Sequence, residues 1–386
     1  MGRTGRIGGT EWRRHRAAAP SGGTVRRRHR VRARRAGAGW STPPGPGRCA
    51  PKLTGQVTAQ WTPGCPPPDG GRTIADVTIH LDAPVTRPRS TPAVDLLEGE
   101  RLLARLPGDG ADRCGADFEA FTLTPLGRTL GAEITGIDLR DRVDEDLRAE
   151  LHRALLEWKV LFFPGQHLTS DRQRELALLW GDLETNPMLD TGDAADVVRF
   201  GTGRRTYENI WHADTTFRPA PAMGAMLRMV QTPPFGGDTV WADMAVAYDN
   251  LTDEVRARID DAVAVHDMVP GFARFLDPER LARGRDLFPP VTHPVVRTHP
   301  ETGRRTLFVN ASFTTEIVGL PREESDALLR HLFAQAHVPE FQVRYRWSEG
   351  TLAFWDNRAT QHYAVGDYHP HTRVAERVAI AGDRPF

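Results

Sequence analysis

A break in composition near residue 117 decides which part of this 386-residue chain can fold. The first 117 residues are rich in Arg, Pro and Gly and include a proline run at residues 66–68. Such a composition buries too little apolar surface to offset the conformational entropy of the chain, so we predict disorder for residues 1–117. We therefore predict one folded domain that spans residues 118–386.

The first 50 residues carry most of the positive charge of this segment. They contain thirteen Arg, no Lys and one acidic residue, Glu11, and thus a net charge of +12, so the rest of the neutral chain carries −12. Three interpretations compete: nucleic-acid binding, a targeting peptide, or an extension without a role from a start codon assigned too far upstream. The segment lacks the apolar core of a secretory signal and the interleaved aromatic residues that stack on bases. We favour the extension and do not expect nucleic-acid binding.

Cysteine usage and hydropathy favour a cytoplasmic protein. The three cysteines, Cys49, Cys65 and Cys114, precede the predicted domain. An odd, scattered set is neither a disulfide framework nor a zinc site, so a reducing cytoplasm is the simplest compartment. No run of about 18 or more apolar residues occurs, so we expect no transmembrane helix and no membrane partner.

From Phe118 onward the pattern predicts a mostly β domain with flanking helices. Asp144 is a candidate N-cap for a helix over 145–158, and Thr169 or Ser170 begins a second helix through 180, with Leu176 and Leu179 facing inward. Short strands are predicted at 160–163, 197–200, 224–230, 238–241, 295–298, 305–309, 342–347 and 351–356. Helical insertions are predicted at 244–264 and 321–336. Many short strands between turns are typical of a sandwich or barrel.

One short motif has the chemistry of a metal site. On an extended segment residues i and i+2 share a face, so His212 and Asp214 would present an imidazole and a carboxylate together. With His362, predicted just after a strand, they would make a 2-His-1-carboxylate triad that leaves three positions on Fe(II) for a co-substrate and O₂. Zinc is disfavoured, because the predicted domain has no Cys. By itself, a His-x-Asp pair is more often a hydrogen-bonded His beside a turn carboxylate.

Several further motifs occur in a characteristic order along the chain. They are Leu123–Gly127, Val160–Phe163, Trp211–Phe217, Gly236–Thr239 and Trp355–His362, followed by Arg373, Arg377, Gly382 and Asp383. From Phe121 to the C-terminus the chain therefore resembles the taurine/2,4-dichlorophenoxyacetate (TauD/TfdA) dioxygenases, which depend on Fe(II) and 2-oxoglutarate. The resemblance implies a double-stranded β-helix (jelly roll) with flanking helices.

The resemblance also implies which residues hold the cofactors. The iron ligands would be His212, Asp214 and His362. Thr239 and Arg373 would bind the distal carboxylate of 2-oxoglutarate, and Trp355 would line its pocket. A dianion needs a fixed cationic fork, and Arg supplies the bidentate geometry that Lys does not. Thr239 as an ordinary strand residue and Trp355 as plain core remain alternatives.

The substrate is predicted to be a small organic anion. Arg377 matches the arginine that holds the anionic group of the substrate, so an alkylsulfonate, an alkyl sulfate or an aryloxyalkanoate is expected. Asn186 stands where the taurine enzyme has a sulfonate-binding His, and it remains a candidate donor to the anion. Leu189 and Glu208 replace a Tyr and an Asn of that enzyme, which argues against taurine itself. The implied reaction is hydroxylation with release of succinate and CO₂, and the presence of Asp214 argues against a halogenase.

Two alternative hypotheses, each for a different class of protein, stay open. The first is a metal-binding jelly roll without oxygenase activity, a cupin-like binding module or isomerase, which would leave Thr239 and Arg373 unexplained. The second is a nucleic-acid-binding protein that acts through the basic N-terminus. A homodimer or tetramer is usual in the resembled family. We assign the remaining histidines near the motifs to the surface or to structure: His293, His299, His369 and His371.

Overall fold

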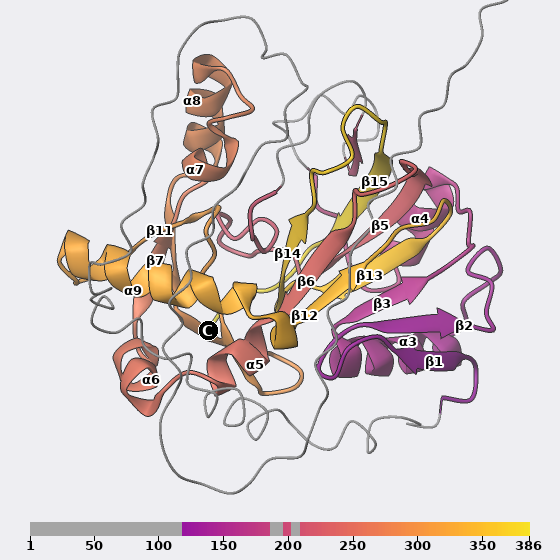
Figure 1. Ribbon diagram of the computed structural model, residues 1–386, viewed down its shortest axis with the longest axis horizontal. Coiled ribbons are helices and arrows are strands. Elements are labelled where there is room, and N and C mark those ends of the chain that lie inside the picture. Colours follow the sequence, from indigo (N-terminus) through magenta and orange to yellow (C-terminus); the bar gives the residue numbers. More distant parts are fainter. Residues whose placement is uncertain (1–117, 186–195, 202–208) are drawn as a thin grey trace, which may run out of the picture. The chain divides into compact units, whose positions relative to one another are not determined.

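The computed structural model describes residues 118–185, 196–201 and 209–386 (Figure 1). The predicted disordered segment 1–117 lies outside the described residues, as do the substrate candidate Asn186 and the neighbouring Leu189 and Glu208. Within the described part, no helix is long and apolar enough to cross a membrane.

The larger sheet in the described part has seven strands. Its order is β1-β2-β3-β13-β5-β15-β4, and all neighbours are antiparallel except β2 and β3. The strands are β1 (Thr122–Pro125), β2 (Ala132–Thr135), β3 (Val160–Phe163), β4 (Val197–Phe200), β5 (Gly224–Gln231), β13 (Leu352–Asp356) and β15 (Val374–Ile380). Strands far apart in sequence are thus neighbours, which brings the C-terminal motifs beside the central ones.

A smaller sheet packs on one face of the larger sheet. It has the order β12-β6-β14, with β6 (Thr239–Asp243), β12 (Gln342–Tyr345) and β14 (Thr360–Ala364). Phe162 of β3 stacks on Tyr345 at a ring-centroid distance of 3.9 Å and meets Trp241 edge-on at 5.3 Å. These rings belong to one buried apolar cluster between the two sheets. The architecture is therefore mostly β, with two sheets face to face, as the strand-rich pattern predicts.

Two helices cover the other face of the larger sheet (Figure 1). α3 (Glu145–Trp158) begins at Asp144, whose carboxylate accepts the Leu147 N–H at 3.0 Å, and α4 (Ser170–Ala177) begins at Thr169. Both caps were predicted. The prediction that Leu179 faces inward was wrong, because α4 ends at Ala177 and the chain turns there. Leu179 is consequently 37% exposed, whereas Leu176 is buried.

The remaining elements lie mostly around the smaller sheet. Helices are α5 (Met244–Asp249), α6 (Asp253–Ile259), α7 (Val269–Phe272), α8 (Pro278–Leu287) and α9 (Arg322–Ala334), with 3₁₀ turns Gln335–His337 and Pro339–Phe341. Strands β11 (Thr314–Ile317), β7 (Val263–His266) and β8 (Val291–Pro294) form one sheet, and β10 (Arg305–Leu307) pairs with β9 (Val296–Thr298). The helical insertion predicted over 244–264 is confirmed as two helices, α5 and α6, with Thr252 as the cap of the second; only its last residues were wrong, because β7 begins at Val263. The sequence pattern did not predict α7, α8, β8, β11, β14 or β15.

Candidate metal centre

Main-chain pairing brings the two candidate histidines together. The N–H of His212 donates to the carbonyl of His362 at 3.1 Å, and the N–H of His362 donates to the carbonyl of His212 at 2.8 Å. Their ring centroids are 4.1 Å apart. The position predicted for His362, just after a strand, was wrong, because His362 lies inside β14 and pairs there with Trp241 of β6. Pairing on both sides of β14 holds the histidine at the edge of the smaller sheet.

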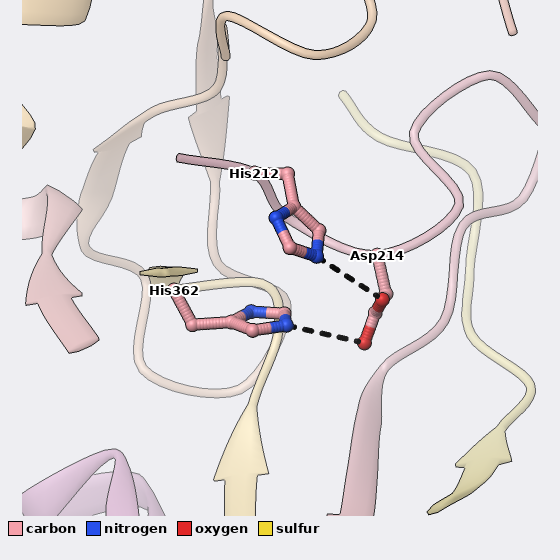
Figure 2. A group of neighbouring side chains, drawn as sticks. All are labelled: His212, Asp214 and His362. Atoms are coloured by element: carbon pink, nitrogen blue, oxygen red, sulfur yellow. Dashed lines mark ion pairs between the residues drawn. The ribbon is translucent and has the colours of Figure 1, made fainter. Parts of the chain in front are cut away.

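Asp214 completes a three-residue cluster with both histidines (Figure 2). One donor atom from each residue lies within 4.8 Å of the others. The Asp214 Oδ1 is 3.9 Å from the His212 Nε2, and its Oδ2 is 4.0 Å from the His362 Nε2. The structure therefore brings together the three residues predicted to bind iron.

The donor set of this cluster fits a divalent metal ion. The His212 Nδ1 lies 2.7 Å from the Ile210 carbonyl oxygen, which can only accept, so Nδ1 carries the proton and Nε2 keeps its lone pair. The Asp214 Oδ2 is buried and has no hydrogen-bond partner among the described residues. A buried, unpartnered carboxylate oxygen beside two imidazole nitrogens matches the two-nitrogen, one-oxygen set that suits Fe(II).

The surroundings also favour the protonation states that bind metal. Burial alone would raise the pKa of Asp214, but Arg377, His362 and His212 outweigh it, so the pKa is lowered and the carboxylate is ionised. Burial, helped by the neighbouring His212, lowers the pKa of His362 well below its usual value. An ionised carboxylate and neutral imidazole are the forms that coordinate a metal.

The two residues predicted to bind 2-oxoglutarate are in contact. The Arg373 Nη2 donates to the Thr239 hydroxyl at 3.3 Å, and its Nε donates to the Gly237 carbonyl at 2.8 Å. Both side chains are buried. Gly237 has a φ of +71°, and a Cβ there would lie 2.9 Å from the Arg373 Cδ. The glycine therefore lets the loop approach the arginine closely.

Sheet register relates the pair of Thr239 and Arg373 to the candidate metal-binding residues. In β6, Thr239 pairs with Ala364 and Trp241 pairs with His362. Alternate residues of a strand share a face, so Thr239 lies on the same face of β6 as Trp241, the residue that pairs with His362. Trp355 is 1% exposed in the core between the sheets, and its ring centroid is 5.0 Å from that of His362. Trp355 thus belongs to the core and also adjoins the candidate metal-binding residue His362.

Arg377, the predicted substrate clamp, lies beside the cluster of His212, Asp214 and His362 in the structure. It comes from β15, and its Nη1 donates to the Asp214 Oδ1. The Nε of Arg377 is buried and has no hydrogen-bond partner among the described residues. Its guanidinium lies 5.4 Å from the centroid of the Phe200 ring. The arginine is therefore fixed beside Asp214, with a donor available for a further group.

Glu184, a carboxylate with a buried side chain near this arginine, was not predicted from the sequence. Its Oε1 accepts from the Thr215 hydroxyl at 3.4 Å, and its Oε2 lies 3.6 Å from the Arg218 Nη1. Burial raises the pKa of Glu184 to about 7; Arg218 opposes the shift and the charge of Asp214 adds to it. Nothing in the local pattern marks this residue, because a single Glu in a polar stretch is ordinarily solvated.

The other histidines have structural or surface positions, as predicted. His299 is buried and its Nε2 lies 3.0 Å from the Asp356 Oδ2. His293 is buried and its Nε2 lies 2.9 Å from the Thr216 carbonyl oxygen. His369 and His371 are exposed.

Comparisons with known proteins agree with this geometry. Residues 122–379 match the family model described as taurine catabolism dioxygenase TauD, TfdA family. An alkylsulfatase of Acinetobacter baylyi is 37% identical over 274 residues, which cover 69% of this chain and 86% of the relative. An alpha-ketoglutarate-dependent sulfate ester dioxygenase of Pseudomonas putida is 38% identical over 274 residues, 68% of this chain and 89% of the relative.

A solved structure of a dioxygenase is also similar to this chain. The crystal structure of a taurine dioxygenase from Burkholderia xenovorans superposes with a TM-score of 0.61 at 36% sequence identity. The match covers 69% of this chain and 91% of that structure.

Proposed function

The chain belongs to the TauD/TfdA family of 2-oxoglutarate-dependent dioxygenases, and from that premise we propose that it hydroxylates a small organic anion, first of all an alkyl sulfate ester. The cofactors of this class are Fe(II), 2-oxoglutarate and O₂. The overall reaction converts R–H, 2-oxoglutarate and O₂ into R–OH, succinate and CO₂. The convergence of His212, Asp214 and His362 carries the proposal.

Each part of the site has a defined task in this reaction. His212, Asp214 and His362 hold Fe(II), which when bound supplies the O₂ chemistry. Arg373 and Thr239 hold the distal carboxylate of 2-oxoglutarate, which orients the keto acid toward the triad. The Ile210 carbonyl keeps the proton on the Nδ1 of His212, so that ring presents Nε2 at the site. Trp355, which is buried and adjoins His362, lines the pocket for 2-oxoglutarate.

The substrate class rests on Arg377 and on the relatives. The buried Nε of Arg377 supports binding of an anionic oxygen, because a charge-assisted hydrogen bond would satisfy it. The relatives at 37% and 38% identity are named for sulfate esters. Hydroxylation of the carbon next to the ester oxygen gives R–CH(OH)–OSO₃⁻. Its C–O bond to sulfate then breaks, and the hydroxyl proton leaves with the sulfate, so the products are an aldehyde and hydrogensulfate. We also keep Asn186 as a proposed contact to this anion.

We extend the proposal to the architecture and the domain boundary. The two mostly antiparallel sheets packed face to face support a double-stranded β-helix, or jelly roll. The family match begins at residue 122, which supports a dioxygenase domain over 118–386 and an accessory segment over 1–117. Activity of a chain that lacks residues 1–110 would test this division. Loss of folding on truncation would contradict it.

The metal assignment is tested with Fe(II) and 2-oxoglutarate under anaerobic conditions. The wild-type protein should show the weak visible charge-transfer band of the chelate. His212→Ala should lack the band, whereas His331→Ala, which removes an exposed histidine of α9, should retain it. A wild-type protein that contains iron but shows no band would refute the dioxygenase proposal.

The substrate class is tested by succinate formation with hexyl sulfate, taurine and phenoxyacetate. Arg377→Ala should raise the KM for the preferred anion about tenfold or more, since it removes a desolvated charge-assisted contact. Arg199→Ala is the matched control: it removes a half-exposed arginine of β4 that pairs with Glu376 at 2.5 Å on the opposite face. An unchanged KM in Arg377→Ala would exclude the clamp. Turnover of phenoxyacetate but not hexyl sulfate would move the proposal to aryloxyalkanoates.

A further inference from the structure

One buried side chain outside the triad holds the main chain of the candidate carboxylate ligand on both sides. The Oδ1 of Asn357 accepts the Asp214 N–H at 2.7 Å, and its Nδ2 donates to the Asp214 carbonyl at 2.9 Å. The same Nδ2 donates to the Ala222 carbonyl at 3.0 Å. Asn357 is 1% exposed, so water cannot substitute for these bonds. The peptide groups that flank the Asp214 Cα are therefore fixed by one residue 143 positions away in sequence.

The residue after Asp214 shows why such a hold is needed. Thr215 has a φ of +54°, in the left-handed region that a β-branched residue rarely adopts. Such a conformation persists only where surrounding contacts enforce it. The Thr215 hydroxyl accepts the Ala222 N–H at 2.9 Å, while Asn357 binds the Ala222 carbonyl. Asn357 and Thr215 together keep this turn in a conformation that the chain alone does not favour.

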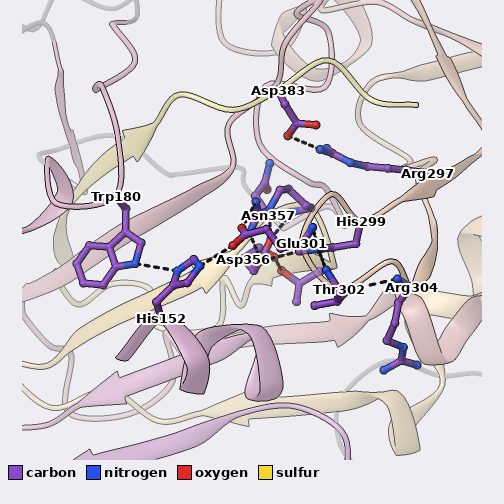
Figure 3. Close-up of polar contacts among 12 residues, drawn as sticks. His152, Trp180, Arg297, His299, Glu301, Thr302, Arg304, Asp356, Asn357 and Asp383 are labelled. Atoms are coloured by element: carbon purple, nitrogen blue, oxygen red, sulfur yellow. Dashed lines mark hydrogen bonds and ion pairs between the residues drawn. The ribbon is translucent and has the colours of Figure 1, made fainter. Parts of the chain in front are cut away.

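Asn357 is itself held in a rigid turn between β13 and β14. Its N–H donates to the Met223 carbonyl at 2.9 Å. Its two sequence neighbours form an ion pair, in which the Arg358 Nη2 donates to the Asp356 Oδ2 at 2.7 Å. The His299 Nε2 lies 3.0 Å from the same oxygen of Asp356 (Figure 3). Asp356 and Arg358 are both buried. The charge network thus fixes the position from which the Asn357 amide reaches Asp214.

The same turn also leads to the second histidine. Five residues after Asn357, β14 presents His362 to the cluster. The turn that contains Asn357 therefore binds the main chain of Asp214 and leads directly into β14, which contains His362. Metal sites need their ligands held within about 0.5 Å of the productive geometry, and such precision comes from the groups that support the ligands.

We infer that Asn357 is a positioning residue that sets the direction of the Asp214 carboxylate, and thereby the metal affinity of the site. The inference rests on the proposed role of Asp214 as a metal ligand. Its action is through the main chain of Asp214, without contact to the metal or the substrate. Loss of such supporting groups typically weakens metal binding about 10- to 100-fold.

The test compares two buried amides. Asn357→Ala removes the hold on Asp214. Gln166→Ala is the control, because Gln166 is also buried and accepts the Leu139 N–H at 2.7 Å, among a separate set of residues. Mn(II) binding is measured on the full chain by the EPR signal of free Mn(II), together with the unfolding temperature of the metal-free protein.

Asn357→Ala should weaken Mn(II) binding tenfold or more, and Gln166→Ala should change it less than twofold, although both lower the unfolding temperature. If Asn357→Ala does not fold, Asn357→Asp replaces it: the acid keeps the volume and the acceptor for the Asp214 N–H but lacks both donors, and the same loss is expected. An Asn357 variant with wild-type Mn(II) affinity would overturn the inference and leave the proposed function intact. Absence of Mn(II) binding in the wild type would instead overturn the metal role of Asp214.

Discussion

Replacement of Arg373 by Ala should reduce the affinity for 2-oxoglutarate far more than any change at the surface. The guanidinium is buried and oriented by the Gly237 carbonyl and the Thr239 hydroxyl, so little side-chain entropy is lost when a carboxylate binds. Removing one partner of a buried, hydrogen-bonded charge pair costs about 2–5 kcal/mol. At about 1.4 kcal/mol per factor of ten, the dissociation constant should rise about 30-fold to a few thousand-fold.

The assay is a titration with 2-oxoglutarate, followed by succinate formation and by the anaerobic charge-transfer band. Arg373→Lys keeps the charge but loses the planar fork, so its affinity should lie between those of the wild type and Arg373→Ala. Arg344→Ala is the control, because Arg344 is exposed and its Nε pairs at 2.7 Å with Asp238, the residue before Thr239. A KM of Arg373→Ala within threefold of the wild-type value would refute the assigned role.

Two further predictions concern buried charges. The pKa of Glu184 is raised from its usual 4.5 to about 7, so between these pH values the folded state binds more protons than the unfolded state. Stability of the metal-free protein should therefore fall by about 3 kcal/mol as pH rises through this window and stay level above it. Glu184→Gln should flatten the profile of unfolding temperature against pH, and an unchanged profile would contradict the assignment. The Lys159 Nζ lies 2.9 Å from the Asp243 Oδ2, and both groups are buried. Lys159→Ala removes the charge partner of the Asp243 Oδ2 and should lower the free energy of unfolding by about 3–5 kcal/mol in urea denaturation. Recovery is expected in a double variant with Asp243→Asn, and a loss below about 1 kcal/mol would show that the pair is not isolated from solvent.

Local sequence determined those features that depend on near neighbours. The helix at 145–158 follows from its cap at Asp144 and from one apolar face, and both are local properties. The strand at 160–163 follows from a continuous apolar run between turn residues. His212 and Asp214 were paired correctly because the side chains at positions i and i+2 of an extended chain lie on one face. The distant His362, Thr239 and Arg373 were found through motif order rather than through any local rule.

Tertiary structure decided what depends on contacts between distant segments. Pairing of β14 with β6 and with His212 placed His362 inside a strand, and no local pattern reports such a pairing. Burial raised the pKa of Glu184, and packing of β15 placed Arg377 in contact with Asp214. Desolvation and charge pairing of this kind arise only when separate elements pack together. The inward orientation predicted for Leu179 failed for the same reason: the helix ends where the tertiary fold turns the chain. The sequence therefore determined which groups the site uses, and packing determined how they are held and charged.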